Sequence, residues 1–523
     1  MKPVRNAIVM MFDTLQHNYI GCYGNTWIKT PNFDRLSRES VLFENAYGNN
    51  MPTIPVRRSM LTGRITLHDV GWGPLRPQDI TIADLLWGTG IETAMAYNSC
   101  PLFNDRNGYA RSWAQTKFSH GYDNYFFIHD DLYHYTIDQF FEDPGYLDRI
   151  RSQPDGDFLE KATRQEMNGY LRDKQYWLEE DDHAVAVNIH EAIRMIESRD
   201  KRHGLMLWID CWDPHEPIDP PSVWTPDMPC PYDPDYKGCD LWSCPPAIAE
   251  RIYTEEQLHH LRMLYAEKIT LCDKYFGKLI KCVMKEGMEE NTLIWFTSDH
   301  GYPCGNGEHG HGLLGKCRPW PYEELVHIPL MIKFPGCKAG ARIKTFVQDC
   351  DCAPTVLDWL GVPIPKNMTG KSLLPLCRGE VEKVRDFAVC GYYSFSWSII
   401  TEDWSYIHWL NKMENGTASE CAQKIYVGHT HAEEYQNEQK AASSGVNEAY
   451  EEYLSQRSID GAEQWTCTPS SKTDVPDTDE LYDRKSDPFQ LHNVIDEYPD
   501  IASQLMRQLI AYMKELSDFD NIK

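Results

Sequence analysis

Three uninterrupted apolar runs constrain the fold of this chain more than any other feature. They lie at residues 6–12, 204–210 and 292–298, and none shows the strict alternation that marks a strand with one wet face. Such runs are typical of strands buried on both faces of a mostly parallel sheet, in which helices form the crossovers. The sequence therefore predicts an α/β fold with a large, mostly parallel central sheet flanked by helices.

Chemically reactive side chains follow these runs. Asp13 follows the first, the proline-flanked His215 comes shortly after the second, and Asp299 with His300 follows the third. Ligands of open α/β sheets bind at the carboxyl ends of strands, so these residues are candidates for one site. Carboxylates and an imidazole could hold a single metal ion. For Asp13 the alternative is a helix-capping loop carboxylate, and for His215 it is an ordinary loop histidine.

The stretch from Asn50 to Arg64 combines a hydroxyl, two prolines and arginines. Thr53 stands where a helix is expected to begin, and backbone N–H groups at such a position favour an anion. Arg57 and Arg64 add forked positive charge that suits phosphate or sulfate oxygens. The same residues are also typical of a proline-rich turn that leads into a threonine-capped helix.

Charge and cysteine usage narrow the function classes. The 523-residue chain carries a formal charge of −27, which argues against a nucleic-acid partner. No stretch reaches the apolar length of a membrane span, and the first residues show no signal-peptide pattern. The 17 cysteines are scattered, an odd number, without a CxxC pair. We expect reduced thiols and a cytoplasmic protein.

The pattern predicts two domains, residues 1–378 and 379–523. Residues 100–180 are expected to form an insertion that lines a substrate pocket, and residues 412–475 a partly flexible insertion. Helices are expected at 178–199, 255–287, 352–361 and 501–516, and another begins at Pro31 with Thr30 as its cap. Short strands at 387–393, 397–401 and 405–410 predict a smaller C-terminal α+β subdomain with an antiparallel sheet.

Five segments, in order, resemble motifs of the sulfatase branch of the alkaline phosphatase superfamily. The resemblance implies the sandwich fold of that superfamily and a metal-dependent hydrolase of phosphoric or sulfuric esters. Thr14 and His300 make the chain look most like the phosphonate monoester hydrolases and phosphodiesterases of this branch. The matching segments are Asp13, Thr53-x-Pro55-x-Arg57 with Leu61–Arg64, Asp213-Pro214-His215, Ser298–Gly301 with His311 and Lys316, and Glu480–Asp483 with Ser486–Pro488.

The same resemblance implies a site. One divalent metal would be held by Asp13, Asp299, His300 and the oxygen of Thr53. A histidine ligand favours manganese or zinc, while calcium and magnesium stay open. The groups expected to bind or protonate the anionic substrate are Arg57, His215, His311 and Lys316, with Asn98 and Arg64 as further substrate-binding candidates. Asn98 is equally explained as a polar residue at a strand end.

Thr53 occupies the position at which this family carries cysteine or serine oxidised to formylglycine. Threonine cannot form the aldehyde hydrate, so we expect no formylglycine. We predict instead that Thr53 attacks phosphorus and forms a phosphothreonine, in the hydrolysis of phosphodiesters or phosphonate monoesters. The alternatives are a sulfatase that acts without formylglycine, a phosphoryl transferase, and a catalytically inactive binding protein.

The expected partner is a small anionic ester, without nucleic acid or membrane. The sequence leaves open the leaving group, the choice between phosphate and sulfate, and the identity of the metal. Acidic enzymes of this class are often homo-oligomers, but the sequence does not specify the oligomeric state.

Overall fold

The computed structural model describes residues 4–520, with gaps. Much of the 100–180 segment, the whole of 412–475 and the candidate Lys316 lie outside the described residues, so the predictions made for them are untested. The gaps are residues 104–106, 121–145, 153–176, 178, 226, 241–246, 250–252, 306–309, 316–319, 394, 411–475 and 477.

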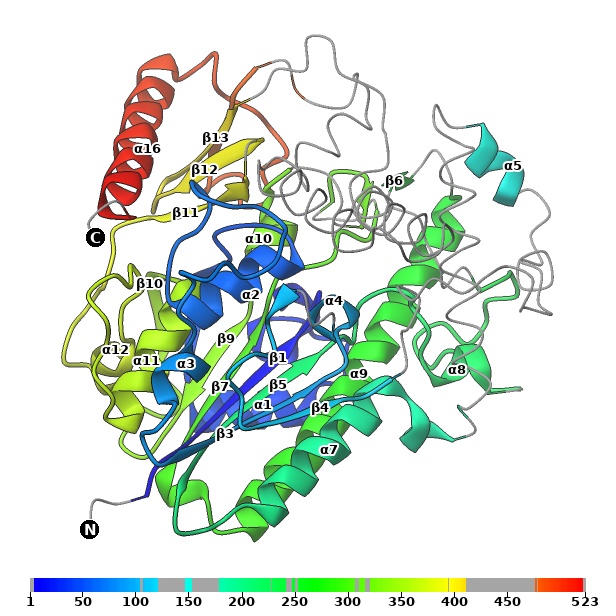
Figure 1. The fold of residues 1–523 in the computed structure, drawn as a ribbon. Coiled ribbons are helices and arrows are strands. Elements are labelled where there is room, and N and C mark those ends of the chain that lie inside the picture. Colours follow the sequence, from blue (N-terminus) through cyan, green and yellow to red (C-terminus); the bar gives the residue numbers. More distant parts are fainter. Residues whose placement is uncertain are drawn as a thin grey trace, which may run out of the picture.

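An eight-stranded sheet forms the centre of the molecule (Figure 1). Its strands are parallel except β9, which runs antiparallel to both of its neighbours. The predicted mostly parallel sheet is therefore confirmed. In spatial order the strands are β10 (Arg342–Gln348), β2 (Val41–Tyr47), β9 (Leu330–Lys333), β7 (Thr292–Ser298), β1 (Asn6–Phe12), β5 (Gly204–Cys211), β3 (Ile91–Tyr97) and β4 (Gln115–Phe118).

The three apolar runs are the three adjacent strands β7, β1 and β5. Phe12 at the end of β1 is in register with Ser298 of β7 and with Cys211 of β5. Because these strands are parallel, the residues that follow them emerge at one edge of the sheet. This register brings Asp13, Trp212 and Asp299 together.

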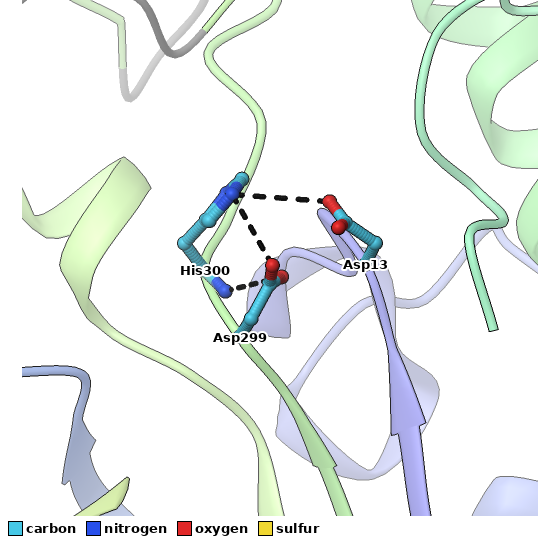
Figure 2. Close-up of side chains that lie close together, drawn as sticks. All are labelled: Asp13, Asp299 and His300. Carbon is cyan, nitrogen blue, oxygen red and sulfur yellow. Dashed lines mark hydrogen bonds and ion pairs between the residues drawn. The ribbon is translucent and has the colours of Figure 1, made fainter. Parts of the chain in front are cut away.

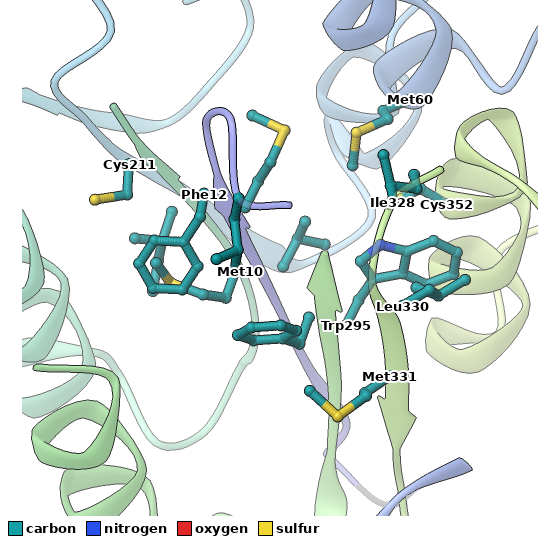
Figure 3. Packing of buried hydrophobic residues seen from close by; sticks show 14 of the residues in the cluster. Met10, Phe12, Met60, Cys211, Trp295, Ile328, Leu330, Met331 and Cys352 are labelled. Atoms are coloured by element: carbon teal, nitrogen blue, oxygen red, sulfur yellow. The ribbon is translucent and has the colours of Figure 1, made fainter. Parts of the chain in front are cut away.

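Helices cover both faces of this sheet (Figure 1). On one face α1 (Pro31–Glu39) and α7 (Ala184–Ser198) pack against the long helix α9 (Glu255–Lys285). On the other, α11 (Cys352–Leu360) packs against β1, β7 and α2 (Thr53–Thr62). Figure 3 shows part of the main buried cluster, with Phe12 and Met10 on one side of the strands and Trp295, Met60 and Cys352 on the other. Alternate side chains of each buried strand thus pack on opposite faces of the sheet.

Helix α1 begins at Pro31, as predicted, but Thr30 does not cap it. The Thr30 hydroxyl accepts a hydrogen bond from Gly21 N instead. The first free N–H groups of the helix, on Asn32 and Phe33, donate to the Asp273 carboxylate of α9 at 2.9 and 2.7 Å. A side chain distant in sequence therefore supplies the cap, which local sequence rules cannot reveal.

A second sheet, four-stranded and antiparallel, follows in the chain. Its order is β11 (Ala388–Tyr392), β12 (Ser396–Ile400), β13 (Trp404–Trp409) and β14 (Glu480–Asp483), and α16 (Pro499–Asp520) packs on β12 and β13. The fold class is therefore confirmed in both parts, a mostly parallel central sheet flanked by helices and a smaller antiparallel sheet. The boundary near residue 378 stays a prediction.

The helix expected over 178–199 begins only at Ala184. A short 3-10 turn, Glu180–Asp182, precedes it, because Tyr275 and Lys278 of α9 hold the Asp181 carboxylate.

None of the described helices is long and apolar enough to cross a bilayer. The remaining α-helices and β-strands of the described residues are α3 (Ile82–Leu86), α4 (Cys100–Phe103), α5 (Tyr146–Arg151), α8 (Pro221–Trp224), α10 (Glu323–Val326), α12 (Leu374–Arg378), β6 (Ala247–Ile248) and β8 (Leu313–Leu314).

Candidate active site

Thr53 is the first residue of α2 and is fully buried at the edge of the central sheet. Its φ of +24° is an outlier for a β-branched residue, and such strain persists only where the surroundings impose it. The Thr53 hydroxyl oxygen lies 3.1 Å from Nε2 of His300. The predicted nucleophile therefore contacts one of the predicted metal ligands.

Asp13, Asp299 and His300 form a compact triad at the ends of β1 and β7 (Figure 2). One ligand atom from each residue lies within 4.8 Å of the others, and all three side chains are buried. His300 Nε2 is 3.4 Å from Asp299 Oδ2 and 3.8 Å from Asp13 Oδ1. The register of the parallel strands thus assembles the metal triad expected from the sequence.

The donor set of this triad fits a divalent cation. His300 Nδ1 lies 2.8 Å from the carbonyl oxygen of Gly301, an acceptor, so Nδ1 carries a proton. In the neutral ring Nε2 then presents a lone pair toward the Asp13 and Asp299 carboxylates. A lone pair facing two carboxylates is favourable when a cation lies between them, and a fixed tautomer is typical of metal-binding histidines.

Backbone amides orient Asp299 within the triad. Its Oδ1 accepts from Thr14 N at 3.0 Å and from its neighbour's N–H, on His300, at 2.7 Å. These bonds leave Oδ2 directed toward His300 and Arg57. Two carboxylates, an imidazole and a hydroxyl could accordingly hold one metal ion, with manganese and zinc well suited to the nitrogen ligand.

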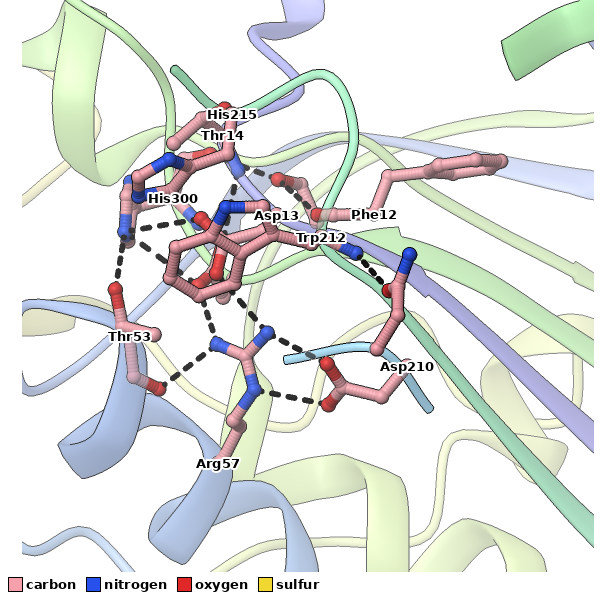
Figure 4. Close-up of polar contacts among 12 residues, drawn as sticks. Phe12, Asp13, Thr14, Thr53, Arg57, Asp210, Trp212, His215 and His300 are labelled. Carbon is pink, nitrogen blue, oxygen red and sulfur yellow. Dashed lines mark hydrogen bonds and ion pairs between the residues drawn. The ribbon is translucent and has the colours of Figure 1, made fainter. Parts of the chain in front are cut away.

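Arg57 lies at the centre of the carboxylates, one turn after Thr53 (Figure 4). Its Nε and Nη2 donate to both oxygens of Asp210 at 2.8 Å each. The other N–H groups reach Asp13 at 3.0 Å, Asp299 at 2.7 Å and the Thr53 carbonyl at 3.2 Å. All five N–H donors of the guanidinium are thereby used. The expected contact of Arg57 with the substrate anion would require one of these bonds to break, and it stays a prediction.

Charge balance explains why Arg57 stays protonated in this buried setting. Burial alone would lower its pKa, but Asp210, Asp13 and Asp299 raise that pKa well above its ordinary value. Three carboxylates and one guanidinium leave the described groups around Thr53 with a charge of −2 if His300 is neutral. One divalent cation would neutralise this charge.

Asp210 is a site residue that sequence reasoning missed. It is the penultimate residue of β5 and is read most easily as the end of an apolar run. A carboxylate inside an otherwise apolar buried strand is itself a signal, because a fully buried charge needs a partner. The partner is Arg57.

The segment after β5 is held by Lys268, which sequence reasoning also missed. This buried lysine of α9 donates to the carbonyl oxygens of His215 and Pro217 at 2.8 and 2.7 Å, and it forms ion pairs with Asp213 and Asp219. In a 31-residue helix with regularly spaced apolar residues, the sequence gave no sign that this particular lysine is buried.

His215 lies on this segment and is buried. Its ring stacks on Trp212 at 3.8 Å between centroids, and Nδ1 contacts the carbonyl oxygen of Glu216. Nδ1–H therefore donates a hydrogen bond to that carbonyl, which leaves Nε2 as the nitrogen available for proton transfer. Figure 4 shows His215 and Trp212 in the same cluster as His300 and Asp13.

Asn98, another predicted site residue, follows β3 and is fully buried. Its Oδ1 accepts from Trp212 N at 2.7 Å, which ties it to the edge of the sheet beside Asp210. Its Nδ2 has no hydrogen-bond partner among the described residues. An unused buried donor at this edge is consistent with the predicted role in substrate binding.

The two other predicted residues that the structure describes are His311 and Arg64. His311 stacks on Tyr322 and contacts Glu324 at 3.1 Å and the Gln490 carbonyl at 2.7 Å, which joins it to the C-terminal part of the chain. Arg64 lies beyond the far end of the ten-residue helix α2, about 15 Å along its axis from Thr53. Contact of Arg64 with the same anion is not supported by this placement.

Comparison with known families shows which family the chain belongs to. A family model described as sulfatase matches residues 5–362, which is more than half of the chain. The chain belongs to the sulfatase family. A second model, the C-terminal region of N-sulphoglucosamine sulphohydrolase, matches residues 307–423. The resemblance of the motifs to the sulfatase branch is therefore confirmed.

Named relatives extend over most of the chain. An N-acetylglucosamine-6-O-sulfatase of Bacteroides thetaiotaomicron is 25% identical and covers 78% of this chain and 79% of its own length. An arylsulfatase of Clostridium perfringens is 26% identical, covering 76% and 82%. The fold matches a phosphonate monoester hydrolase of Agrobacterium radiobacter with a TM-score of 0.63 at 18% identity, covering 98% and 96%. This sulfatase-family protein is a hydrolase of sulfuric or phosphoric esters.

Proposed function

We propose that this sulfatase-family hydrolase cleaves phosphodiesters or phosphonate monoesters, with one divalent metal and Thr53 as the nucleophile. The observation that carries the proposal is the position of the Thr53 hydroxyl, 3.1 Å from Nε2 of the ligand histidine His300. A hydroxyl held in the ring of metal ligands can be deprotonated at neutral pH and attack an ester.

The charge of the site supports a substrate with a single negative charge. The described carboxylates and Arg57 sum to −2, which one divalent ion brings to zero. A neutral buried site accepts a monoanion at lower electrostatic cost than a dianion. Phosphodiesters, phosphonate monoesters and sulfate monoesters are monoanions, whereas phosphate monoesters are largely dianions at neutral pH.

Thr53 as the nucleophile then favours hydrolysis of a phosphorus ester over hydrolysis of a sulfate ester. A formylglycine hydrate carries two hydroxyls and releases sulfate by collapsing to the aldehyde. Thr53 has one hydroxyl on its β-carbon, so the covalent intermediate must be hydrolysed by water that attacks the phosphorus or sulfur atom. Phosphothreonine is an intermediate of this kind.

The residues act in two steps. A bound metal would lower the pKa of the Thr53 hydroxyl and offset the charge of the substrate. The Thr53 alkoxide Oγ forms a bond to phosphorus as the bond to the leaving oxygen breaks, and His215, as the imidazolium, donates its Nε2 proton to the departing alcohol. Water then attacks the same phosphorus and gives one proton back to His215 Nε2, while the Oγ–P bond breaks and Thr53 leaves as the alkoxide. Arg57 holds Asp13 and Asp299 in place throughout.

A sulfatase that acts without formylglycine is the second candidate. It is favoured by the relatives named as N-acetylglucosamine-6-O-sulfatase and arylsulfatase, which match over about three quarters of the chain. In that case Thr53 would attack sulfur, and water would have to open the sulfated threonine.

Parallel kinetics on two substrates separate these candidates. The protein is stripped of metal, reloaded with manganese, zinc or calcium, and assayed on methyl phenyl phosphate and on phenyl sulfate, with Thr53→Ala beside it. The proposal expects metal-dependent cleavage of the diester that Thr53→Ala abolishes. Faster turnover of the sulfate ester would contradict it. Transfer of the phosphoryl group to an added alcohol would point to a transferase, and metal binding without turnover of either ester to a binding protein.

A further inference from the structure

The C-terminal motif at Ser486–Pro488 lies in the turn that follows β14. The Asp487 carboxylate accepts from Leu491 N at 3.0 Å and from His492 N at 2.7 Å. Gln490 N donates to the Asp487 carbonyl oxygen at 3.2 Å. These bonds fix the backbone on both sides of Gln490.

Gln490 is both strained and buried. Its φ of +59° lies in the left-handed region, which residues other than glycine rarely adopt, and the residue is only 1% exposed. Strain of this kind persists where the surroundings impose it, and it is concentrated at functional sites. The side chain is oriented by its Nε2, which donates to Ser405 Oγ of β13 at 2.6 Å.

Gln490 holds the first two residues of helix α10. Its Oε1 accepts from Glu323 N at 2.7 Å, so it fills the role of a helix cap that Tyr322, at the N-cap position, is not suited to fill. Its carbonyl oxygen accepts from His311 Nε2 at 2.7 Å. His311 Nδ1 in turn donates to Glu324 Oε1 at 3.1 Å. One residue of the C-terminal turn therefore reaches α10 both directly and through a histidine.

His311 is a charged link in this arrangement. Its two ring nitrogens face a carbonyl oxygen and a carboxylate, which are both acceptors, so both nitrogens carry a proton. Burial alone would lower the pKa of His311, but its bond to Glu324 raises that pKa above the ordinary value. The ring also stacks on Tyr322 at 3.6 Å between centroids.

The other end of α10 holds the two loops of the active site. Gly301 N donates to the Leu325 carbonyl oxygen at 2.7 Å, and Gly48 N donates to the Val326 carbonyl oxygen at 3.0 Å. Gly301 directly follows the metal-ligand histidine, and Gly48 lies in the loop that leads from β2 into α2. Helix α10 thus fixes both loops relative to each other.

The two glycines allow these backbones to pack directly against one another. A Cβ atom at Gly301 would meet the Glu324 carbonyl oxygen at 2.1 Å, and a Cβ atom at Gly48 would meet the Asp299 carbonyl oxygen at 3.1 Å. Closely packed backbone atoms transmit a displacement instead of absorbing it. A shift of α10 would therefore move both loops.

We propose that Gln490 is a positioning residue of this hydrolase, which fixes the Thr53 hydroxyl relative to Nε2 of His300 by holding α10. The inference rests on the proposed nucleophile Thr53 but not on the choice between a phosphoric and a sulfuric ester. Tyr47 and His327 also hold α10, through the Glu323 carboxylate at 3.0 and 2.9 Å, so loss of the Gln490 amide should impair the site without abolishing it.

Two substitutions separate positioning from folding. Gln490→Met removes the amide oxygen at similar volume, whereas Gln490→Gly removes the side chain and relieves the left-handed strain, so we expect it to stay folded. The matched control is Asn493→Leu, because Asn493 Oδ1 accepts from Leu481 N of β14 at 3.0 Å, in the same segment. Urea unfolding establishes that each protein is folded before its kinetics are measured.

The kinetic test uses whichever of methyl phenyl phosphate and phenyl sulfate the wild type cleaves. Both Gln490 variants should lower kcat on the order of tenfold, with a much smaller change in KM, because the reacting pair is misplaced. Asn493→Leu should keep kcat. Wild-type kcat in folded Gln490→Gly would overturn the inference, and this variant decides alone if Gln490→Met does not fold.

Manganese binding tests the same link without turnover. The Kd for Mn²⁺, measured from the EPR signal of the free ion, should rise on the order of tenfold in both Gln490 variants, because a residue that orients a ligand from outside the coordination sphere is lost. Asn493→Leu should keep the wild-type Kd. If the wild type cleaves neither ester, the proposed function fails, and an unchanged Kd in Gln490→Gly would then overturn the inference.

Discussion

The hydroxyl oxygen of Thr53 and Nε2 of His300 lie 3.1 Å apart, at the meeting point of helix α2 and strand β7. The backbone of Thr53 is strained, with φ of +24°, whereas the His300 ring is fixed by its bond to the Gly301 carbonyl. The helix therefore presents a reactive side chain to a ligand whose orientation is already set. Thr53 should accordingly be more sensitive to substitution than any other threonine of the helix.

Thr53→Ala should lower kcat by at least about a thousandfold, because a nucleophile contributes on that scale. Thr53→Ser keeps the hydroxyl and should retain much of the activity. The matched control is Thr62→Ala at the other end of α2, where the hydroxyl donates to the Arg58 carbonyl oxygen at 2.7 Å. A Thr53→Ala protein that keeps a tenth of the wild-type rate would show that another group is the nucleophile.

Metal binding should stabilise the fold measurably. Manganese or zinc at about one hundred times its Kd should add about 2.7 kcal/mol to the free energy of unfolding, by linkage. His300→Ala should lose most of this gain in a thermal or urea titration. His203→Ala, which removes an exposed histidine, serves as the control. Equal metal stabilisation of the wild type and His300→Ala would place the ion elsewhere.

Arg57→Met should destabilise the protein by about 3–5 kcal/mol, because it leaves three buried carboxylates without their cation. Added metal should restore part of this loss by neutralising Asp13 and Asp299. Urea unfolding with and without metal measures both effects, and Arg38→Met on the exposed end of α1 is the control. A loss below 1 kcal/mol would mean that the carboxylates do not depend on Arg57.

Asp349 should make stability depend on pH. Burial raises the pKa of its carboxyl to about 7, although Asn49 and Ser59 donate hydrogen bonds that partly oppose the shift. A raised pKa means that the folded protein binds the proton more tightly than the unfolded chain. This contribution is therefore complete below pH 4 and is lost as pH rises toward 7 and above.

The matched measurement compares the wild type with Asp349→Asn at pH 4.5 and pH 8. The wild type should lose more free energy of unfolding over this interval, since each unit of pKa shift corresponds to about 1.4 kcal/mol. The comparison removes the contribution of Asp273, whose pKa burial raises to about 6 in both proteins. If the two proteins lost equal free energy of unfolding between pH 4.5 and pH 8, the assignment to Asp349 would be refuted.

The sequence predicted the centre of the sheet better than its edges. Strands β1, β5 and β7 are buried along their whole length, so their apolar runs were unambiguous. Strand β10 alternates exposed and partly buried residues over its first half, and β2 contains two partly buried polar positions. Their pattern did not distinguish them from loops, and neither was predicted.

The candidate site likewise contains residues that the sequence predicted and residues that it did not. Asp13, Asp299 and His300 follow recognisable strands, and parallel register necessarily brings them to one edge. Asp210 and Lys268 act through contacts between distant segments, with Arg57 and with the loop that carries His215. Such contacts depend on the packed arrangement of helices and strands. A carboxylate in an apolar strand signals that Asp210 needs a partner, but the local sequence does not identify the partner of either residue.

The most direct test of the central claim is the mass of the peptide that contains Thr53, after rapid acid quench of metal-loaded protein turning over methyl phenyl phosphate. The account predicts a phosphoryl ester on Thr53 that appears during turnover and disappears when the substrate is exhausted. An unmodified Thr53 at every quench time, with the diester still being cleaved at the same rate by Thr53→Ala, would contradict it.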